Sequence, residues 1–457
     1  MKKINICINT QTPLVKFNIT NSDLEKTNEG MPPLNLNNAR EGKDYHFTPG
    51  GVTRMIYPLL KMMLNRGLAE NVHWVSLNPH GPEESTIDGI NLSHISMAPD
   101  RIKGYGFTKE VIWSTIHGLP NSASDPSDIF WQDEYSDFTY YNRLSTERML
   151  KLDKNFDFDL FYIHDFQQLP IGHMLNTLKP KIFRWHIPFD ESTIPLEWKE
   201  FLSIYLNSYD RIVVSCKKYL KALKSFGYTG KSCLVYPYID PAMYSKPTPS
   251  EAIEFCTEFG ISNKDKVVLV VARLDPMKGQ DRAIKAIAKA IKDVPNIKLV
   301  LAGNGSFSSS KQGVNLSKAE KWLSELKNLA ECLGIRDHVI FTGHLTQSQL
   351  NAAYQRSDVV VLPSIREGFG LVVIEGWLFK KPVIVTSKAG ISELIKENHI
   401  GAIYKPDDIE ALSDKIIRLL LDKKYAKSLG ERGNSISKKC YLDRGINDEL
   451  EIINELM

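Results

Sequence analysis

The chain alternates short, almost wholly apolar runs with longer amphipathic stretches, and it does so in two successive series. Continuous apolar runs between helical stretches are typical of parallel strands that are buried on both faces. The first series predicts strands at 4–8, 72–77, 160–163, 182–185 and 212–215, and the second predicts strands at 266–272, 297–302, 338–342, 358–362 and 382–386. The fold class that we expect is therefore α/β, with two Rossmann-like domains.

The length of the chain also favours two domains. Its 457 residues exceed the ~250–300 that a single hydrophobic core usually serves. A proline-interrupted segment at 234–241 separates the two series and is typical of a linker. We predict a first domain at 1–240, a second at 241–435, and a C-terminal helix at 436–457 that crosses back to the first. Two such domains facing each other would enclose a ligand cleft at the carboxyl ends of their strands.

Two polar segments are expected to form loops. Residues 12–45 are rich in Asn, Thr and Pro and predict an irregular surface insertion. Residues 306–315 follow the turn signal Gly303-Asn304-Gly305 and form a candidate lid over a binding site.

Charge and cysteine usage exclude several function classes. The formal net charge is only +3 and no long basic block occurs, so nucleic acid and membrane surfaces are not expected partners. The six cysteines show no CxxC pair, which predicts reduced thiols and a cytoplasmic protein. The first apolar run is too short for a signal peptide. A monomer and a homo-oligomer are both compatible with the sequence.

The most informative motif of the second half pairs two carboxylates. Glu367 lies in the loop after the apolar run 358–362, and Glu375 lies in the first turns of a helix that begins near Leu371. Between them, Gly368, Phe369 and Gly370 lead into that helix. A helix N-terminus offers free N–H groups and partial positive charge, which suit a phosphate. The pattern predicts a site for a nucleotide sugar, with the diphosphate held between two hydroxyl-binding carboxylates.

Two cations follow the first strand of the same series. Arg273 and Lys278 are separated by a tight turn that Pro276 and Gly279 close. We expect both side chains to stabilise the charge that develops on a leaving diphosphate. No DxD-type acidic cluster accompanies the site, so no metal and no cofactor are expected. The competing use of paired carboxylates, as the acid and nucleophile of a glycosidase, is disfavoured because Glu375 lies beside a phosphate-type helix terminus.

In the first half, polar residues again follow apolar runs. Gly50 and Gly51 precede a helix at 55–64, and paired glycines let backbone N–H groups approach a phosphate or sugar. Asp165 and His186 stand at the ends of two predicted strands. We expect His186 to hydrogen-bond a transferred sugar and Asp165 to bind sugar hydroxyls or the acceptor.

The stretch from Arg273 to Glu375 resembles the C-terminal domain of retaining GT-B glycosyltransferases, the broad family that includes sucrose synthase. The resemblance implies a GT-B fold in which the second domain binds the nucleotide sugar. It implies that Glu367 contacts the sugar and that Glu375 holds the ribose hydroxyls. It also implies that the amides of Leu371 and Val372 meet the diphosphate. Arg273 and Lys278 match the phosphate-binding pair.

Four ordered segments, 107–117, 140–143, 163–170 and 186–189, are similar to trehalose-6-phosphate synthases. This resemblance implies that Tyr105 and Trp113 line a glucose-6-phosphate pocket in the first domain, that Asp165 binds sugar hydroxyls and that His186 contacts the transferred glucose. The sequence departs from that family at 9–13, Asn-Thr-Gln-Thr-Pro, where those synthases carry a phosphate-binding Arg. The second half instead resembles the broader family, which includes archaeal trehalose synthases.

The expected activity is transfer of glucose from a nucleotide-glucose to glucose-6-phosphate, with formation of α,α-trehalose-6-phosphate. The cations that could replace the missing Arg are Lys16, Arg54, Arg101, Lys103 and Lys109, and of these we favour Arg54 and Lys103. The alternatives are a trehalose synthase that uses free glucose and a catalytically inactive sugar-phosphate sensor. The donor base is left open among UDP, GDP and ADP, because base contacts in such clefts are mostly backbone and apolar.

Overall fold

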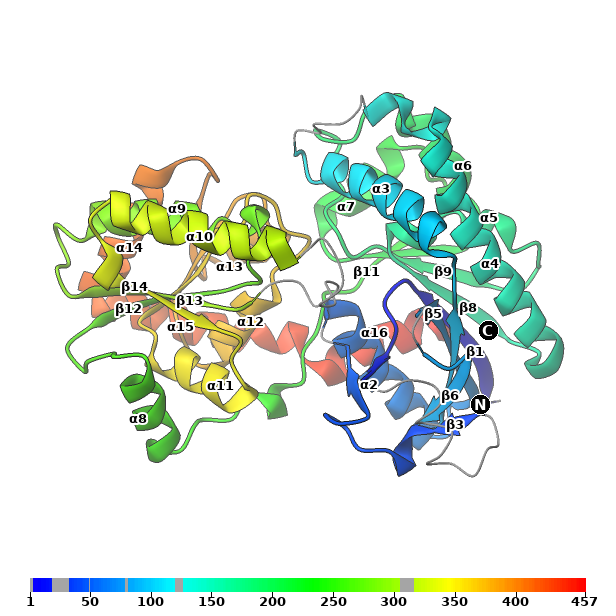
Figure 1. The fold of residues 1–457 in the computed structure, drawn as a ribbon, viewed down its shortest axis with the longest axis horizontal. Helices are drawn as coiled ribbons and strands as arrows, with labels where there is room; N and C mark the ends of the chain where they lie inside the picture. Colours follow the sequence, from blue (N-terminus) through cyan, green and yellow to red (C-terminus); the bar gives the residue numbers. More distant parts are fainter. Residues whose placement is uncertain (1–2, 19–32, 49, 79–80, 120–125, 305–315) are drawn as a thin grey trace. The chain divides into compact units, whose positions relative to one another are not determined.

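The computed structural model describes residues 3–18, 33–48, 50–78, 81–119, 126–304 and 316–457. It divides into two compact units. The first comprises Met1–Tyr236 and Ile446–Met457, and the second comprises Pro237–Gly445. The proposed lid at 306–315 lies outside the described residues. Each unit is an α/β body whose strands are flanked by helices (Figure 1).

The first unit is built on a nine-stranded sheet in the order β11-β10-β9-β8-β1-β5-β7-β6-β3. Within the seven strands from β11 to β7, all neighbours pair in parallel. The order reverses between β1 and β8, as in doubly wound folds. The strands are β1 (Ile4–Thr10), β3 (Leu34–Asn35), β5 (Ala69–Leu77), β6 (Glu84–Ile87), β7 (Ile90–Ile95), β8 (Leu160–His164), β9 (Lys181–Arg184), β10 (Arg211–Val214) and β11 (Lys231–Leu234).

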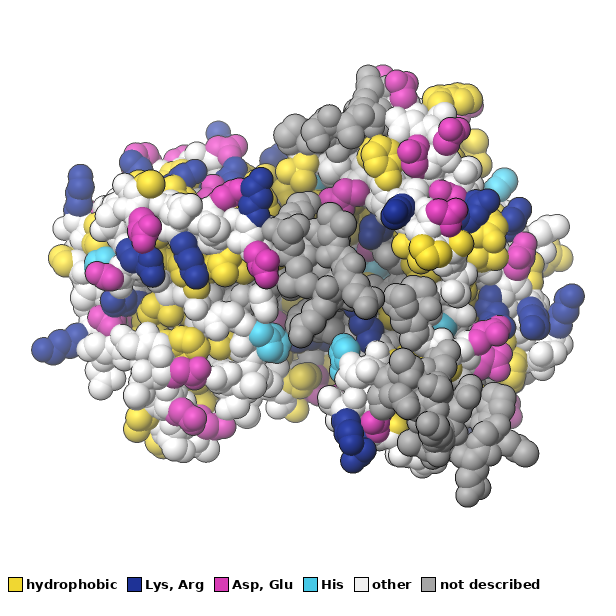
Figure 2. Space-filling model, in the orientation of Figure 1, with side chains coloured by type: hydrophobic (Ala, Val, Ile, Leu, Met, Phe, Trp, Pro, Cys, Tyr) yellow, Lys and Arg dark blue, Asp and Glu magenta, His cyan; other side chains and the backbone are white. Residues whose placement is uncertain are grey.

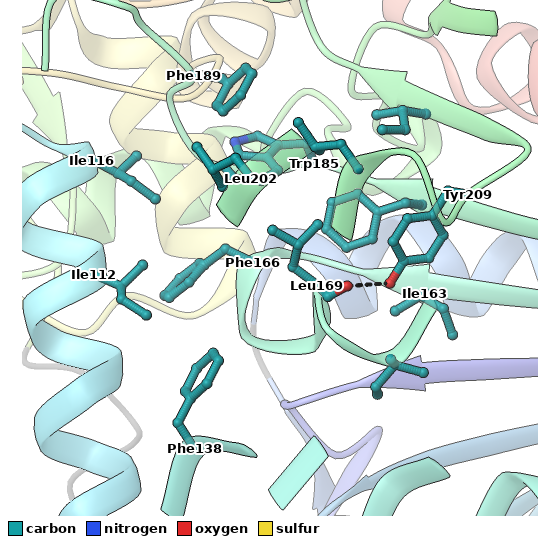
Figure 3. Close-up of a cluster of buried hydrophobic side chains, with 14 of the residues drawn as sticks. Ile112, Ile116, Phe138, Ile163, Phe166, Leu169, Trp185, Phe189, Leu202 and Tyr209 are labelled. Carbon is teal, nitrogen blue, oxygen red and sulfur yellow. Dashed lines mark hydrogen bonds between the residues drawn. The ribbon is translucent and has the colours of Figure 1, made fainter. Parts of the chain in front are cut away.

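Helices of the first unit bury a large aromatic and aliphatic core. Figure 3 shows part of this core, where Phe166 and Trp185 pack among side chains from α3 and α4. Tyr209 donates a hydrogen bond of 2.9 Å to the Leu169 carbonyl within it. The helices are α2 (Gly51–Asn65), α3 (Pro99–Ile116), α4 (Asp133–Phe156), α5 (Ile171–Met174), α6 (Trp198–Leu206), α7 (Lys217–Ser225) and most of α16 (Leu442–Asn454).

Two parts of this unit differ from the sequence-based expectation. Strands β6 and β7 form an antiparallel hairpin around Asp88 and Gly89, both at positive φ (51° and 79°). Such a two-residue Asp-Gly loop is a strong hairpin signal, so the sequence carries a local indication of this turn. The expected surface insertion at 12–45 is only partly irregular. It contains β2 (Val15–Phe17), which pairs with β4 (Tyr45–Phe47), and buries Leu14 and Leu36 completely.

The second unit contains a six-stranded, wholly parallel sheet in the order β14-β13-β12-β15-β16-β17. Its order reverses between β12 and β15, which is the doubly wound arrangement of a dinucleotide-binding fold. The strands are β12 (Lys266–Val271), β13 (Ile297–Ala302), β14 (Val339–Gly343), β15 (Val359–Leu362), β16 (Val383–Thr386) and β17 (Ala402–Tyr404).

Helices cover both faces of this second sheet, with α9 and α10 on one side and α8 and α11 on the other (Figure 1). The strands contribute fully buried Val, Leu and Ile side chains to the core between these layers. The helices are α8 (Pro249–Glu258), α9 (Gln280–Ala290), α10 (Leu316–Cys332), α11 (Gln347–Arg356), α12 (Leu371–Leu378), α13 (Ser392–Asn398), α14 (Ile409–Leu421) and α15 (Lys423–Ser437).

The surface carries charges of both signs. On the face shown in Figure 2, Lys and Arg side chains are interspersed with Asp and Glu, and hydrophobic groups lie between them. No helix in the described part of the chain is long and apolar enough to cross a membrane.

A buried ion pair joins the C-terminal helix α16 to the first sheet. Arg184 on β9 and Glu449 on α16 are 2% and 1% exposed and contact each other directly. Tyr162 on β8 donates a 2.6 Å hydrogen bond to Glu449 Oε2, and Arg184 donates to the Val235 carbonyl at 3.3 Å. Burying both charges is unfavourable unless they stay paired. The final helix is therefore fixed to the two strands whose carboxyl ends carry the histidines described below.

Removing one partner of this pair should destabilise the protein far more than replacing both. Glu449→Ala leaves the Arg184 charge buried and unpaired, which should lower the free energy of unfolding by about 3–5 kcal/mol. The double variant Arg184→Met/Glu449→Leu should be close to neutral, because apolar groups of similar volume avoid the desolvation penalty. Denaturant unfolding followed by fluorescence would measure both. Equal destabilisation of the single and double variants would contradict this account.

Candidate functional site

In the second unit, the predicted donor residues gather where the strand order reverses. Arg273 and Lys278 follow β12, and Glu367 follows its neighbour β15. Ligands of doubly wound sheets bind outside the carboxyl ends of the strands at this reversal. The four residues predicted from the sequence, Arg273, Lys278, Glu367 and Glu375, therefore belong to one edge of one sheet.

Two of these residues form an ion pair. Lys278 Nζ lies 2.6 Å from Glu367 Oε2, and both side chains are 21% exposed. Ser364 Oγ donates to the same carboxylate oxygen at 3.1 Å. The Lys278 ammonium and the Glu367 carboxylate are both partly exposed. They therefore present a cation next to hydrogen-bond acceptors. That arrangement can bind a phosphate and a sugar hydroxyl at neighbouring points.

The ion pair depends on a close approach of two loops. Ile365 N donates to the Met277 carbonyl at 2.9 Å. Gly279 has φ +66°, and a Cβ there would lie 2.0 Å from the Pro363 carbonyl oxygen. Only glycine fits this position, because it has no Cβ and tolerates positive φ. Arg273 is 41% exposed, and its Nη2 lies 3.2 Å from Asp275 Oδ2.

The N-terminus of α12 is shaped for an anion. Gly370 precedes the helix with φ 113°, and no side chain caps the first turn, which begins with Leu371 and Val372. The neighbouring segment supports the loop: Gly390 N donates to the Glu367 carbonyl at 3.2 Å and Ile391 N to the Phe369 carbonyl at 3.0 Å. A Cβ on Gly390 would lie 2.3 Å from the Gly368 carbonyl oxygen. The first-turn N–H groups and the helix dipole favour a phosphate at this position.

Glu375 lies one turn further along α12 and is only 4% exposed. Each of its carboxylate oxygens accepts a hydrogen bond from a tyrosine. Tyr244 donates to Oε1 at 2.9 Å, and Tyr354 donates to Oε2 at 2.5 Å. Neither tyrosine was predicted, because nothing in the local sequence around residue 244 or 354 signals a partner on another element.

In the first unit, polar side chains follow two adjacent strands next to the reversal of the strand order. Asp165 comes directly after β8 and His186 shortly after β9. Asp165 has φ 70° and ψ 164°, a conformation that is strained for any residue with a Cβ and that clusters at functional sites. Its carboxylate accepts from Phe166 N at 3.0 Å. His164 Nδ1 and His186 Nε2 lie 3.1 Å apart, so the two strand ends are joined by an imidazole pair.

Burial sets the protonation of this cluster. It lowers the pKa of His164 well below the ordinary value, with further lowering from His186 and Arg184. The pKa of His186 is also lowered well below its ordinary value, by burial and then by Arg184. Burial raises the pKa of Asp165 to about 7, against the opposing effect of backbone hydrogen bonds from Phe166 and His186. The histidines are therefore neutral at physiological pH, while Asp165 can take up or release a proton.

The predicted acceptor residues differ in their exposure. Tyr105 on α3 is 2% exposed, and its hydroxyl has no hydrogen-bond partner among the described residues. Burial raises the pKa of the Tyr105 hydroxyl well above its ordinary value, and Tyr141 and then Asp165 raise it further. Trp113 on the same helix is half-buried and stacks on His117 at 4.0 Å. Arg54 and Lys103 are exposed, on α2 and α3.

Gly50 and Gly51 stand at the start of α2, which begins without a side-chain cap. This helix start has the same character as that of α12, with backbone N–H groups at a glycine. Within the described ranges, no group of three or more His, Cys, Asp or Glu side chains is arranged to hold a metal ion.

Two family models match the chain. Residues 254–435 match "Glycosyl transferases group 1", and residues 108–221 match "Trehalose synthase, N-terminal domain". Curated relatives include trehalose synthases from Thermococcus litoralis, 27% identical over 300 residues that cover 65% of this chain and 69% of the relative. The trehalose synthase of Pyrococcus horikoshii is 25% identical over 305 residues, with coverage of 65% and 69%.

Solved structures show the same fold over the whole chain. Trehalose-6-phosphate synthase OtsA superposes with a TM-score of 0.73 at 16% identity and covers 99% of this chain and 98% of that one. The α,α-trehalose 6-phosphate synthase of Burkholderia multivorans gives a TM-score of 0.73 at 15% identity, with coverage of 100% and 99%. This chain has the GT-B fold, and its residues 254–435 match the group 1 glycosyl transferases. The predicted fold class and the predicted resemblance to that family are confirmed.

Substituting Gly279 should destabilise the second unit more than substituting another glycine of the same conformation. Gly260 has φ +61° with nothing within 4 Å of a Cβ, so Gly260→Ala should lower the free energy of unfolding by only about 1–2 kcal/mol. Gly279→Ala adds the collision with Pro363 and should lower it further. Denaturant unfolding of both variants would test this, and equal losses would contradict the role given to the close approach.

The raised pKa of Asp165 predicts how stability depends on pH. Between about pH 4 and 7 the folded protein keeps this proton and the unfolded chain releases it. The stability of the wild type relative to Asp165→Asn should therefore fall as pH rises through this range, by up to about 1.4 kcal/mol per pH unit. Denaturant unfolding of both proteins at several pH values would measure the difference. A difference that is constant with pH would show that the carboxyl is not held protonated.

Proposed function

We propose that this protein transfers glucose from a nucleotide-glucose to the anomeric hydroxyl of glucose-6-phosphate, with formation of α,α-trehalose-6-phosphate. The observation that carries the proposal is the Lys278–Glu367 ion pair at the strand reversal, beside the uncapped N-terminus of the helix that bears Glu375. This combination offers a cation, amide N–H groups and two carboxylates to one ligand. A nucleoside diphosphate sugar carries the matching anions and hydroxyls.

Structural neighbours support the donor class. A structural neighbour from E. coli is bound with UDP-2-fluoro glucose, and HepE from Anabaena is in complex with UDP and glucose. We assign Glu367 to sugar hydroxyls, Glu375 to the ribose, and Arg273 with Lys278 to the diphosphate. The amides after Gly370, at Leu371 and Val372, complete the diphosphate contacts. The donor base is not assigned.

The similarity to trehalose synthases over residues 108–221 supports glucose as the acceptor unit. In the first unit we assign Asp165 to sugar hydroxyls and His186 to the transferred glucose. The orphaned hydroxyl of Tyr105 is a further candidate, because a buried polar group without a partner is unfavourable until a ligand supplies one. Arg54 and Lys103 are the cations proposed for the acceptor phosphate.

In the proposed reaction, the bond between glucose C1 and the diphosphate oxygen breaks while C1 bonds to the acceptor's anomeric oxygen. The proton of that hydroxyl passes to the departing diphosphate on the same face of the sugar, so the configuration is retained. Arg273 and Lys278 stabilise the charge on the diphosphate as it leaves. The neutral His186 can hydrogen-bond the sugar without adding a further positive charge. The expectation that neither metal nor cofactor takes part stays a prediction.

Two observations favour a second candidate, trehalose synthesis from free glucose. The trehalose synthases of Thermococcus litoralis and Pyrococcus horikoshii match this chain over 69% of their own length. The segment at 9–13 lacks the Arg that grips the acceptor phosphate in trehalose-6-phosphate synthases. Both cations that we assign to the phosphate are exposed. The assay must therefore determine whether the acceptor glucose has to carry a phosphate.

One coupled assay distinguishes the candidates. UDP-, GDP- and ADP-glucose are each combined with glucose and with glucose-6-phosphate, and release of the nucleoside diphosphate is followed. We expect one donor to give turnover with glucose-6-phosphate well above that with glucose. Equal or greater turnover with glucose would reject the first proposal in favour of the second. No transfer with any pair would reject both.

Removing both donor cations should abolish turnover. Arg273→Ala/Lys278→Ala leaves the departing diphosphate without its two cations, so kcat should fall by at least about 100-fold. Lys285→Ala, which removes an exposed lysine on α9 from its pair with Asp281, serves as the control and should keep wild-type activity. An unchanged rate in the double variant would refute the assigned donor site.

A further inference from the structure

We propose that Tyr244 and Tyr354 are positioning residues that orient the Glu375 carboxylate so that it accepts from both ribose hydroxyls of the donor. This rests on the proposed function, which assigns Glu375 to the ribose. It adds that selection for ribose depends on two phenol hydroxyls, which lie 131 and 21 residues from Glu375 in the sequence.

The geometry of the three side chains carries the inference. Tyr244 donates to Oε1 at 2.9 Å and Tyr354 to Oε2 at 2.5 Å, so each oxygen has one donor. Glu375 is 4% exposed, Tyr354 is fully buried and Tyr244 is 9% exposed. Hydrogen bonds to a buried charged group are strong and direction-dependent. Rotation of the carboxylate about its terminal bond would break both at once.

Helix α11 aligns the two donors. It carries Tyr354, whose ring stacks on Phe379 with centroids 5.6 Å apart and an interplanar angle of 12°. It also carries Asn351, which donates at 3.2 Å to the carbonyl of Met243, the residue before Tyr244. Helix α11 therefore fixes the positions of both phenol groups. The orientation of the carboxylate is set by α11 as well as by α12.

A fixed carboxylate has a definite use here. An ionised carboxylate offers about four lone-pair sites, and the tyrosines use one on each oxygen. Each oxygen keeps one further site, which matches the two adjacent hydroxyls of a ribose. A site that is built to accept from a hydroxyl discriminates strongly against a ligand that lacks it. Because both oxygens are fixed, the hydrogen bond from the 2′-hydroxyl can contribute its full free energy to nucleotide binding.

The test compares ribose with 2′-deoxyribose. Calorimetry on the full chain measures the Kd of UDP, GDP and ADP, and of the 2′-deoxy counterpart of whichever binds tightest. We expect the wild type to favour the ribose form by at least about 10-fold. Tyr244→Phe and Tyr354→Phe should each weaken binding of the ribose form by about 10-fold and reduce the preference several-fold. They should raise KM for the donor more than they lower kcat.

The chain supplies a matched control. Tyr404 in the same unit is 3% exposed, and its hydroxyl has no hydrogen-bond partner among the described residues. Tyr404→Phe removes the same atom and should leave both affinities unchanged. Melting temperatures would identify a variant that fails to fold. If Tyr354→Phe does not fold, the Tyr244→Phe variant tests the inference, because Tyr244 is less buried.

The outcomes separate this inference from the proposed function. If the wild type prefers the ribose form and both tyrosine variants keep the full preference, the inference fails and the donor site stands. Nucleotide binding without any ribose preference in the wild type would overturn the inference and the assignment of Glu375 to the ribose, while the assigned diphosphate contacts would stand. If none of the three nucleotides binds, the assigned donor site and the inference fall together.

Discussion

The site residues of both units depend on one constraint, the parallel direction of the strands. Because parallel strands all end at the same edge, residues that follow different strands are brought together there. In the second unit this unites Lys278 after β12 with Glu367 after β15, across 89 residues of chain. In the first it unites His164 and His186 at the ends of β8 and β9. The loops after these strands must also approach each other closely. Gly279 allows this approach, because a Cβ there would collide with the Pro363 carbonyl oxygen.

Buried polar groups make these edges rigid. Behind the histidines, Glu449 and Arg184 form an ion pair that is almost fully excluded from solvent, and the charge of Arg184 helps to keep both imidazoles neutral. In the second unit, two tyrosines hold Glu375, one on α11 and the other just after the turn at 241–243. In each case the partner comes from another element of the unit. Contacts that stabilise the fold therefore also fix the polar groups at the sheet edge.

The sequence predicted those features of the fold that depend on a local residue pattern. Apolar runs located five strands of the first sheet and five of the second to within a few residues, but they did not locate β3, β6, β7, β11 and β17. The turn at Pro276 and Gly279 indicated that Arg273 and Lys278 lie at the end of a strand. The hairpin of β6 and β7 has a local signal in Asp88 and Gly89. Other contacts had none: Tyr244 and Glu375 are 131 residues apart, and Tyr162 and Glu449 are 287 apart. Such pairs arise from tertiary packing, which periodicity and spacing do not encode.

The most direct test of glucosyl transfer to an anomeric hydroxyl is to identify the product. The wild type would be incubated with glucose-6-phosphate and a nucleotide sugar labelled with ¹³C at glucose C1, and the label followed by NMR. The account predicts that the label appears in a non-reducing, α,α-linked disaccharide that carries the phosphate. Label recovered as free glucose, or in a disaccharide that keeps a reducing end, would contradict it.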